Sequence, residues 1–465
     1  MSHTHFIGIA GIAMSAVALL LRQKGESVSG SDEGMYPPAS EILPAAGITI
    51  SSPYAAANIP PETTRIVIGK TAKVNADNPE FQEALRRQQE GSVVIQSYPE
   101  VLADATAGRH NIVVCGSYGK STTASLAAWM LTHAGIDAGY MLGARALNFA
   151  GNSHVGTAAP FVMEGDEYPS SNMDDRAKFL HYAPSTVILT SAQHDHPNVF
   201  PTHADYLKPF QQLLAKLTPD QLLVACADDA HAMALLPQTK ARVVTYGTTA
   251  GDYRVENPTF GATSTFMLSK NGTPLCEIST HELGLHNMQN MAGAGAALLE
   301  DKLLTPAQVV AALAAFKGVK RRMERLNPTG SIPLYEGFGS SADKARSAIA
   351  AMRLHFPDNR LVVVFEPHTF GWRNPVNLPD YDTAFTGADE LFVYPPHAGA
   401  GLLSHQEILA RLQTSFSGNL HPLGENLPAN LATLQEHLEP KDVVLLLTSG
   451  DLGGLIPPLA ELLTR

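Results

Sequence analysis

A glycine-rich segment in the first third of the chain constrains the fold more than any other feature. It follows an apolar run, precedes a run of small residues and leucine, and reads Gly116-Ser117-Tyr118-Gly119-Lys120-Ser121-Thr122-Thr123. A strand, a glycine loop and a helix in this order form the setting of a phosphate-binding loop. Glycine lets backbone N–H groups converge on phosphate oxygens, the helix N-terminus adds partial positive charge, and Lys120 adds a full charge. We therefore expect nucleotide binding in a parallel α/β sheet.

The same segment contains oxygen donors for a metal ion. Ser121 or Thr122 can place a hydroxyl on Mg²⁺ that bridges the phosphates. The alternative interpretation is an ordinary turn between a strand and a helix. Two glycines, a lysine and adjacent hydroxyls are much harder to obtain by chance than a glycine pair alone, so the pattern favours the nucleotide site.

Composition restricts the class of protein. The 465 residues suggest three domains, and 32 basic against 44 acidic residues give a net charge of −12. This charge argues against nucleic acid or an anionic membrane as partner. The cysteines are too few and scattered for a disulfide framework or a zinc cluster, which favours a reducing cytoplasm. The apolar stretch 6–21 has no basic segment before it and contains two glycines, so we expect neither a signal peptide nor a membrane span.

The start of the chain has the pattern of a βαβ unit. We expect a strand at His5–Ile9, a helix to Lys24 and a second strand from Ser27 that ends at Ser31-Asp32. The acid after the second strand is suited to a ribose hydroxyl. The third glycine of the dinucleotide fingerprint is absent. A dehydrogenase cofactor site and a plain doubly wound domain are both compatible with this stretch.

Two polar residues follow strands of the expected central sheet. Glu164 follows the apolar run Phe161–Met163, and His196 lies beyond the run Thr186–Leu189. Ligands of open parallel sheets gather at the carboxyl ends of the strands, so both side chains are candidates to face the phosphate loop. Glu164 is a candidate Mg²⁺ ligand, whereas we expect Asp166 and Glu167 in a solvated acidic loop. For His196, a hydrogen-bonded loop histidine is the competing interpretation.

Two further stretches carry polar residues near the end of the central region. Asn287 and Asn290 stand three apart in a predicted helix, and their carboxamides offer the paired donor and acceptor that an adenine edge requires. Helix capping is the alternative, which only one of them can serve. A basic cluster around Arg322 precedes the next strand. Such clusters are usually solvated, but at a domain junction an arginine can reach a phosphate.

Strand and helix runs alternate through the whole chain, which predicts an α/β fold of three domains. We place them at residues 1–107, 108–327 and 328–465. The first and last are expected to be Rossmann-like, and the middle one a P-loop ATPase-like parallel sheet.

Taken together, these motifs resemble the Mur ligase family, in the family's order and over the whole chain. The resemblance implies ATP, Mg²⁺ and a UDP-sugar as ligands. It implies UDP-sugar contacts from Gly8, Gly11, Ser15, Ser31 and Asp32. It implies ATP contacts from Gly116, Ser117, Gly119, Lys120, Ser121, Thr122, Asn287, Asn290 and Arg322, with Lys120, Glu164, His196 and Arg322 as the catalytic set. Ser121, Glu164 and His196 are the implied metal ligands.

Within this family, three stretches look most like the ligase that adds murein tripeptide to UDP-N-acetylmuramate in peptidoglycan recycling. They are Tyr36–Ser40, Asp166–Tyr168, and Asp175–Phe179 with His181-Tyr182. The implied reaction proceeds through an acyl phosphate in the cytoplasm. The L-alanine-adding ligase is the alternative, because the segment from Gly8 resembles that enzyme at least as well. Oligomeric state is not predicted.

The chain departs from the family pattern at two places. Where the family has two acids, an aromatic residue and two histidines, this chain reads Glu336-Gly337-Phe338-Gly339-Ser340-Ser341. The acid expected on the nucleotide is Gly337, and Glu336 is expected on the opposite face of its strand. Gln193 stands where the family commonly has glutamate. These departures favour a third hypothesis, a nucleotide-binding homologue with weak catalysis.

Overall fold

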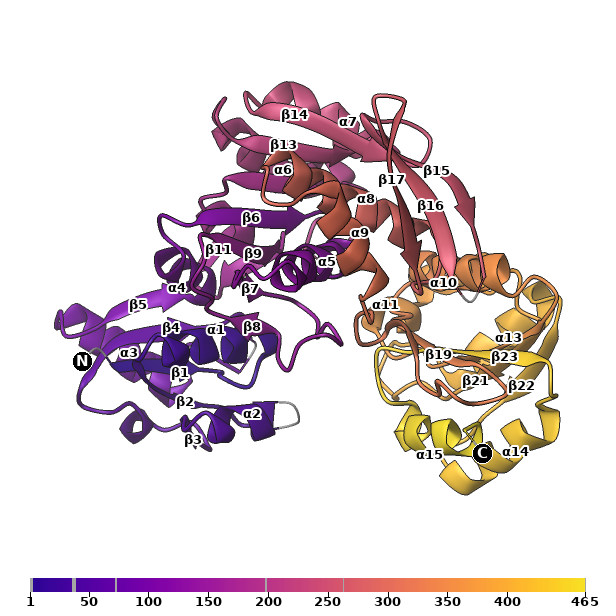
Figure 1. Cartoon of the computed structure of the whole chain (residues 1–465). Coiled ribbons are helices and arrows are strands. Elements are labelled where there is room, and N and C mark those ends of the chain that lie inside the picture. Colours follow the sequence, from indigo (N-terminus) through magenta and orange to yellow (C-terminus); the bar gives the residue numbers. More distant parts are fainter. Residues whose placement is uncertain (1–2, 36–38, 72, 197–198, 262, 465) are drawn as a thin grey trace. The chain divides into compact units, whose positions relative to one another are not determined.

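The computed structural model describes residues 3–35, 39–71, 73–196, 199–261 and 263–464 of the chain. It contains two compact units, each with its own core (Figure 1). The first unit comprises Met1–Asn257, Phe266–Ile278 and Gln289–Phe316, and the second comprises Pro258–Thr265, Ser279–Met288 and Lys317–Arg465. Three large sheets and a two-stranded hairpin build the described part of these units, in agreement with the α/β class that the sequence predicts.

The first sheet has five parallel strands in the order β3-β2-β1-β4-β5. The strands are β1 (His3–Ile7), β2 (Ser27–Ser31), β3 (Thr49–Ser51), β4 (Thr63–Ile68) and β5 (Val94–Ser97). The helices are α1 (Ile12–Gln23), α2 (Ala39–Ala45), α3 (Pro79–Gln89) and α4 (Tyr98–Ala105). The predicted βαβ unit is therefore confirmed as β1-α1-β2, although β1 begins and ends two residues before the predicted strand His5–Ile9.

The second sheet has ten strands in the order β17-β16-β15-β14-β13-β12-β6-β9-β7-β8. Its centre is β6 (His110–Cys115), β9 (Pro160–Gly165), β12 (Thr186–Leu189), β13 (Leu222–Cys226) and β14 (Arg242–Gly247). Outside lie β7 (Gly139–Met141), β8 (Ser153–His154), β15 (Tyr253–Thr259), β16 (Ser264–Lys270) and β17 (Thr273–Thr280), while β10 (Pro169–Ser171) and β11 (Asp174–Ala177) form a separate hairpin. The helices are α5 (Lys120–His133), α6 (His203–Lys216), α7 (Ala230–Leu235), α8 (Leu285–Glu300) and α9 (Pro306–Ala314).

The pairing register of the central strands aligns their carboxyl ends. Cys115 of β6 pairs with Gly165 of β9 on one side and with Leu189 of β12 on the other. All three strands are parallel, so the segments that follow them emerge at the same edge of the sheet. These strands are buried on both faces and read as continuous apolar runs, as expected for a parallel sheet covered by helices.

The sheet of the second unit has the order β18-β19-β23-β20-β21-β22, in which β18 is antiparallel to β19 and the other pairs are parallel. Its strands are β18 (Arg322–Arg325), β19 (Leu334–Gly337), β20 (Arg360–Phe365), β21 (Glu390–Val393), β22 (Asn419–Pro422) and β23 (Asp442–Leu447). Its helices are α10 (Ala342–His355), α11 (Phe370–Arg373), α12 (Tyr381–Ala384), α13 (His405–Ser415), α14 (Leu427–His437) and α15 (Ile456–Leu462). Among the helices of the described ranges, none combines the length and apolar character needed to cross a membrane.

Gly30, on strand β2 of the first sheet, has no room for a larger side chain. Gly30 pairs with Phe6 of β1, and a Cβ added at Gly30 would lie 2.6 Å from Ile9 Cδ1 and 2.8 Å from the Phe6 carbonyl oxygen. Both distances are shorter than real Cβ contacts allow. This position therefore has to be glycine for steric reasons.

We predict that Gly30→Ala lowers the free energy of unfolding by about 1–3 kcal/mol, the usual cost of overpacking. Urea unfolding of the variant and the unmodified chain measures this change in the free energy of unfolding. Gly151→Ala is the matched control, because a Cβ at Gly151 meets no atom within 4 Å, and it should change stability by no more than about 0.5 kcal/mol. Equal stabilities for the two variants would contradict the prediction.

Candidate active site

The phosphate loop joins β6 to α5 through residues 116–119. Gly116 (φ +135°) and Gly119 (φ +82°) adopt left-handed conformations that disfavour other residues. Space is limiting as well: a Cβ at Gly116 would lie 2.3 Å from Thr190 Oγ1, and a Cβ at Gly119 would lie 2.7 Å from Asn290 Oδ1. Both glycines are thus required for the turn, as the sequence pattern predicts.

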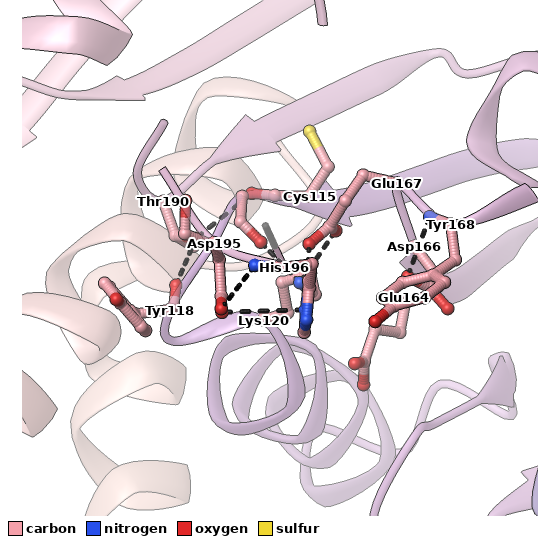
Figure 2. Close-up of polar contacts among 12 residues, drawn as sticks. Cys115, Tyr118, Lys120, Glu164, Asp166, Glu167, Tyr168, Thr190, Asp195 and His196 are labelled. Carbon is pink, nitrogen blue, oxygen red and sulfur yellow. Dashed lines mark hydrogen bonds and ion pairs between the residues drawn. The ribbon is translucent and has the colours of Figure 1, made fainter. Parts of the chain in front are cut away.

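The loop lysine is held by a buried carboxylate. The Lys120 ammonium donates to the Gly116 carbonyl oxygen (2.5 Å) and pairs with Glu167 Oε2 at 2.9 Å (Figure 2). The Glu167 side chain is fully buried, and that of Lys120 is 14% exposed. Burial disfavours the charged ammonium, but Glu167, Asp166 and Glu164 outweigh it and raise the pKa of Lys120. Lys120 therefore carries its charge at neutral pH.

This pairing corrects the expectation of a solvated acidic loop after β9. Glu167 lies inside the site, and Asp166 pairs with Lys178 Nζ at 2.5 Å. Burial opposes the Asp166 carboxylate, yet Lys178 and Lys120 hold its pKa below the usual range. The prediction failed because an acidic run reads as solvent-exposed when the lysines that neutralise it lie elsewhere in the chain.

Glu164, at the end of β9, faces the start of α5. Its Oε1 accepts the Ser121 hydroxyl (3.1 Å), and its Oε2 accepts the Gly143 backbone N–H (2.9 Å). A Cβ at Gly143 would lie 2.4 Å from Glu164 Oε2, so glycine leaves the room that the carboxylate occupies. Burial raises the pKa of Glu164, and Lys120 and Ser121 partly offset this shift. A hydroxyl and a carboxylate oxygen at this spacing form a donor set that fits Mg²⁺.

His196 lies beside Glu167, the carboxylate that pairs with Lys120. Its Nε2 is 3.7 Å from Glu167 Oε1 and 3.6 Å from Asp195 Oδ2, and its ring packs edge-on against Tyr168 at 4.6 Å between centroids. Its backbone is left-handed (φ +59°), which is uncommon for a residue other than glycine. The histidine thus joins the cluster, as Figure 2 shows. Its role as a metal ligand stays a prediction.

Sequence reasoning missed Tyr206. Its hydroxyl, on α6, lies 2.9 Å from Ser117 Oγ and 3.1 Å from Glu167 Oε1, and Ser117 Oγ donates to the Gln193 carbonyl oxygen at 2.5 Å. The tyrosine therefore ties the phosphate loop to the carboxylate that holds Lys120. Burial raises the pKa of the Tyr206 phenol, so it remains a neutral donor. No short motif marks it, because it reads as an apolar-face residue of an amphipathic helix.

The two asparagines lie on α8, which begins where the sequence predicts a helix. Asn290 is buried beside Gly119 of the phosphate loop. Asn287 is buried in the second unit, where its Nδ2 donates to the Leu283 carbonyl oxygen at 2.9 Å. Their contact with adenine stays a prediction.

Arg322, on β18 of the second unit, stacks its guanidinium on the Phe338 ring at 4.4 Å. The neighbouring Arg321 pairs with Glu336 Oε1 at 2.7 Å, and burial raises the pKa of Glu336. The phosphate contact of Arg322 stays a prediction.

The Gly337 position is lined by apolar side chains. A Cβ there would lie 3.3 Å from Leu447 Cδ2 and 3.4 Å from Met323 Sδ. Nearby, Ser341 caps α10, and Ser340 Oγ accepts from Lys344 Nζ at 3.1 Å. The stretch in which the family has acids and histidines therefore serves packing, a helix cap and local hydrogen bonds in this chain.

The predicted UDP-sugar segment also forms a compact loop. Gly8 is left-handed (φ +85°), and Asp32 Oδ2 accepts the Ala10 N–H at 2.9 Å. Ser15 Oγ donates to the Ile12 carbonyl oxygen (3.0 Å), and the buried Ser31 hydroxyl donates to Glu80. Asp32 thus shapes the loop in addition to any contact with a ligand. Gly11, at the N-cap of α1, has an extended backbone, and an added Cβ would make ordinary contacts, the nearest with the Gly8 carbonyl oxygen and Met14 Cγ at 3.8 Å.

Comparison with known proteins extends the resemblance. Residues 3–110 match the Mur ligase family, catalytic domain, and residues 114–298 match the Mur ligase middle domain. A UDP-N-acetylmuramate–L-alanine ligase of Desulforapulum autotrophicum is 30% identical, with 99% of this chain and 98% of that protein covered. The UDP-N-acetylmuramate–L-alanyl-gamma-D-glutamyl-meso-2,6-diaminoheptandioate ligase of Haemophilus influenzae is 27% identical, with 98% of each covered. The crystal structure of UDP-N-acetylmuramate-alanine ligase from Thermotoga maritima superposes with a TM-score of 0.79 at 25% identity, covering 99% of each chain.

The buried ion pair between Lys120 and Glu167 leads to a prediction about the stability of the fold. Lys120→Met leaves the Glu167 carboxylate buried without its cation, and Glu167→Gln removes the charge that faces Lys120. Removing one partner of a buried pair costs about 3–5 kcal/mol, and we expect the single variants to approach this range. The double variant should cost less than the sum, with a coupling of about 0.5–3 kcal/mol.

Urea unfolding of the four proteins, without nucleotide, measures this coupling. The exposed pair Lys208–Asp205 (2.7 Å) on α6 is the matched control. A double-mutant cycle with Lys208→Met and Asp205→Asn should show no measurable coupling between these two residues. Additive effects of Lys120→Met and Glu167→Gln would contradict the role of the pair.

Proposed function

This chain belongs to the Mur ligase family, and from that premise we propose that it joins L-alanine to the carboxyl group of UDP-N-acetylmuramate in an ATP-dependent reaction. One observation carries the choice of acceptor: the L-alanine ligase of Desulforapulum autotrophicum is 30% identical over nearly the full length of both proteins. The Thermotoga maritima enzyme, with a TM-score of 0.79, supports it as well. The comparisons thus favour L-alanine over the tripeptide acceptor that the sequence stretches suggest.

We also propose that the chain divides into three domains, at residues 1–107, 108–327 and 328–465.

In the proposed reaction, the muramyl carboxylate oxygen attacks the γ-phosphorus of ATP and ADP leaves. The acceptor amine then attacks the carbonyl carbon of the resulting acyl phosphate, and phosphate leaves. Positioning and neutralisation of charge supply most of the rate in phosphoryl transfer. Lys120, held charged by Glu167, is placed to stabilise the phosphoryl oxygens.

The other roles are proposed from the resemblance to the family, and one contact, between Ser121 and Glu164, supports the metal site. Ser121 Oγ and Glu164 Oε1, 3.1 Å apart, would hold Mg²⁺. When bound, that ion neutralises phosphate charge. Asn290 is assigned to adenine together with Asn287, His196 to a second metal position with Glu164, and Arg322 to the phosphates. Burial raises the pKa of the Glu164 carboxyl, so the acid form persists to higher pH and metal binding should weaken on acidification.

The tripeptide ligase remains a second candidate because a specific observation favours it. The Haemophilus influenzae relative is 27% identical over 98% of both chains, and two of the stretches typical of that ligase surround Asp166 and Lys178 in the site. The third stretch, Tyr36–Ser40, lies partly outside the described residues. The weak-catalysis hypothesis rests on Gly337, Ser340 and Ser341, and an added Cβ at Gly337 would meet Leu447 and Met323.

The acceptor is tested by measuring phosphate release from ATP with UDP-N-acetylmuramate and one amine at a time. We expect turnover with L-alanine at least about ten-fold faster than with the tripeptide L-Ala-gamma-D-Glu-meso-diaminopimelate, a difference of about 1.4 kcal/mol in transition-state binding. Faster turnover with the tripeptide selects the second candidate. Nucleotide binding without turnover for either amine selects the weak-catalysis hypothesis.

A pair of variants tests whether the two nucleotides bind separate sites. Gly11→Val should weaken UDP-N-acetylmuramate binding about ten-fold or more while ATP binding is kept, because a side chain there blocks close approach of the pyrophosphate. The nearest atoms to an added Cβ lie 3.8 Å away, so the fold should tolerate the change. The double variant Lys120→Met/Glu167→Gln should weaken ATP binding while UDP-N-acetylmuramate binding is kept. Calorimetry with each nucleotide decides this, and parallel losses in both variants would contradict two sites.

A further inference from the structure

The carboxyl ends of three adjacent strands of the second unit bring a carboxylate and two imidazoles together. Glu366 and His368 follow β20, His397 follows β21, and Thr448 and Ser449 follow β23, which pairs with β20 on its other side. One ligand atom from each of Glu366, His368 and His397 lies within 4.8 Å of the other two. None of the motifs of the ligase reaction includes these three residues.

Glu366 is the buried member, with 2% of its surface exposed. Its Oε2 accepts the Thr448 hydroxyl and the Leu452 backbone N–H (3.1 Å). Among the residues of the described ranges, no lysine or arginine pairs with this carboxylate, and no donor reaches its Oε1. Burying a carboxylate without a counter-charge is costly. A cation bound at Oε1 would supply that charge.

A hydrogen bond of the kind that surrounds metal ligands orients one of the two imidazoles, that of His368. His368 Nδ1 lies 3.2 Å from Ser449 Oγ, which leaves Nε2 for a ligand. The backbone of His397 is anchored by Arg373, whose Nη1 donates to its carbonyl oxygen at 3.1 Å. Gly450 preserves the space between the carboxylate and the first ring, since a Cβ there would lie 2.6 Å from both Glu366 Oε2 and His368 Cδ2.

We propose that Glu366, His368 and His397 form a binding site for a divalent transition-metal ion of the Zn²⁺ type. Two imidazoles and one carboxylate are a frequent three-residue ligand set for Zn²⁺, and nitrogen donors favour such ions over Mg²⁺. The ion would neutralise the buried carboxylate and tie together the segments that follow β20 and β21. The proposal does not depend on the ligase reaction.

The site requires a modest contraction to bind metal. Zn²⁺ bonds of about 2.0–2.2 Å place tetrahedral ligand atoms about 3.3–3.6 Å apart. His397 is exposed, so rotation of its side chain can close the present spacing, while Glu366 and His368 remain held by their hydrogen bonds. The exposed side leaves a coordination position for water or for a ligand group.

A second cluster in the first unit provides an instructive contrast. Glu100, Asp174 and His181 also group their ligand atoms, but Arg176 pairs with Asp174 at 2.8 Å and with Glu100 at 3.7 Å. The guanidinium already supplies the positive charge there. Of these two clusters, we therefore expect the one at Glu366 to bind Zn²⁺.

The test is Zn²⁺ titration of the full chain by calorimetry, in the absence of nucleotides, with Co²⁺ absorption as the spectroscopic readout of nitrogen ligands. We expect one Zn²⁺ per chain. His368→Gln and His397→Gln should each weaken binding by more than about 10- to 100-fold, the usual effect of losing an outer hydrogen-bond partner, and Ser449→Ala should weaken it by about that amount.

His231→Gln is the matched control, because His231 is an exposed histidine whose ring packs edge-on against His203 (4.2 Å between centroids) in the first unit. This variant should bind Zn²⁺ like the unmodified chain. His397 is on the surface, so its substitution tests the site without disturbing the core. The proposal is overturned if the unmodified chain binds no Zn²⁺, or if His397→Gln binds it as tightly as His231→Gln does.

Discussion

The ion pair between Lys120 and Glu167 is the interaction on which the rest of the site depends. Neither group alone would be stable in this position, because burial opposes each charge. Lys120 is held in the phosphate loop by Glu167 and by the Gly116 carbonyl oxygen, and Tyr206 hydrogen-bonds to Glu167 in turn. The parallel register of β6, β9 and β12 makes this possible, since it brings the segments that carry the two charges to one edge of the sheet.

Polar groups also gather at the carboxyl ends of parallel strands in each of the three large sheets. In the first sheet this arrangement produces the loop that Asp32 holds through the Ala10 N–H. In the second it produces the Ser121–Glu164 oxygen pair, and in the third the Glu366, His368 and His397 cluster. The chemistry differs because the residues that follow the strands differ, while the backbone supplies the same geometry.

The stretch around Gly337 shows how one family pattern is adapted in this chain. Arg321 uses Glu336 as its counter-ion, and the Gly337 position is filled by Leu447 and Met323. The expectation that these neighbours face opposite sides of β19 is supported by these different surroundings. The short stretches of this chain resemble the tripeptide ligase, whereas a relative that is 30% identical over nearly the full length is an L-alanine ligase.

Local signals were sufficient for the elements of the fold and for the phosphate loop. The strand Thr186–Leu189 and the turn glycines of the loop follow from apolar runs and backbone conformation, which act over a few residues. Pairings between distant residues were not predictable in the same way. Glu167 meets Lys120 across 47 residues and Tyr206 meets Ser117 across 89, and only the packed sheet and its covering helices bring them together. The sequence by itself determined the fold class and the nucleotide loop, whereas the tertiary structure decided which charges are buried and paired, because that depends on contacts that chain order does not record.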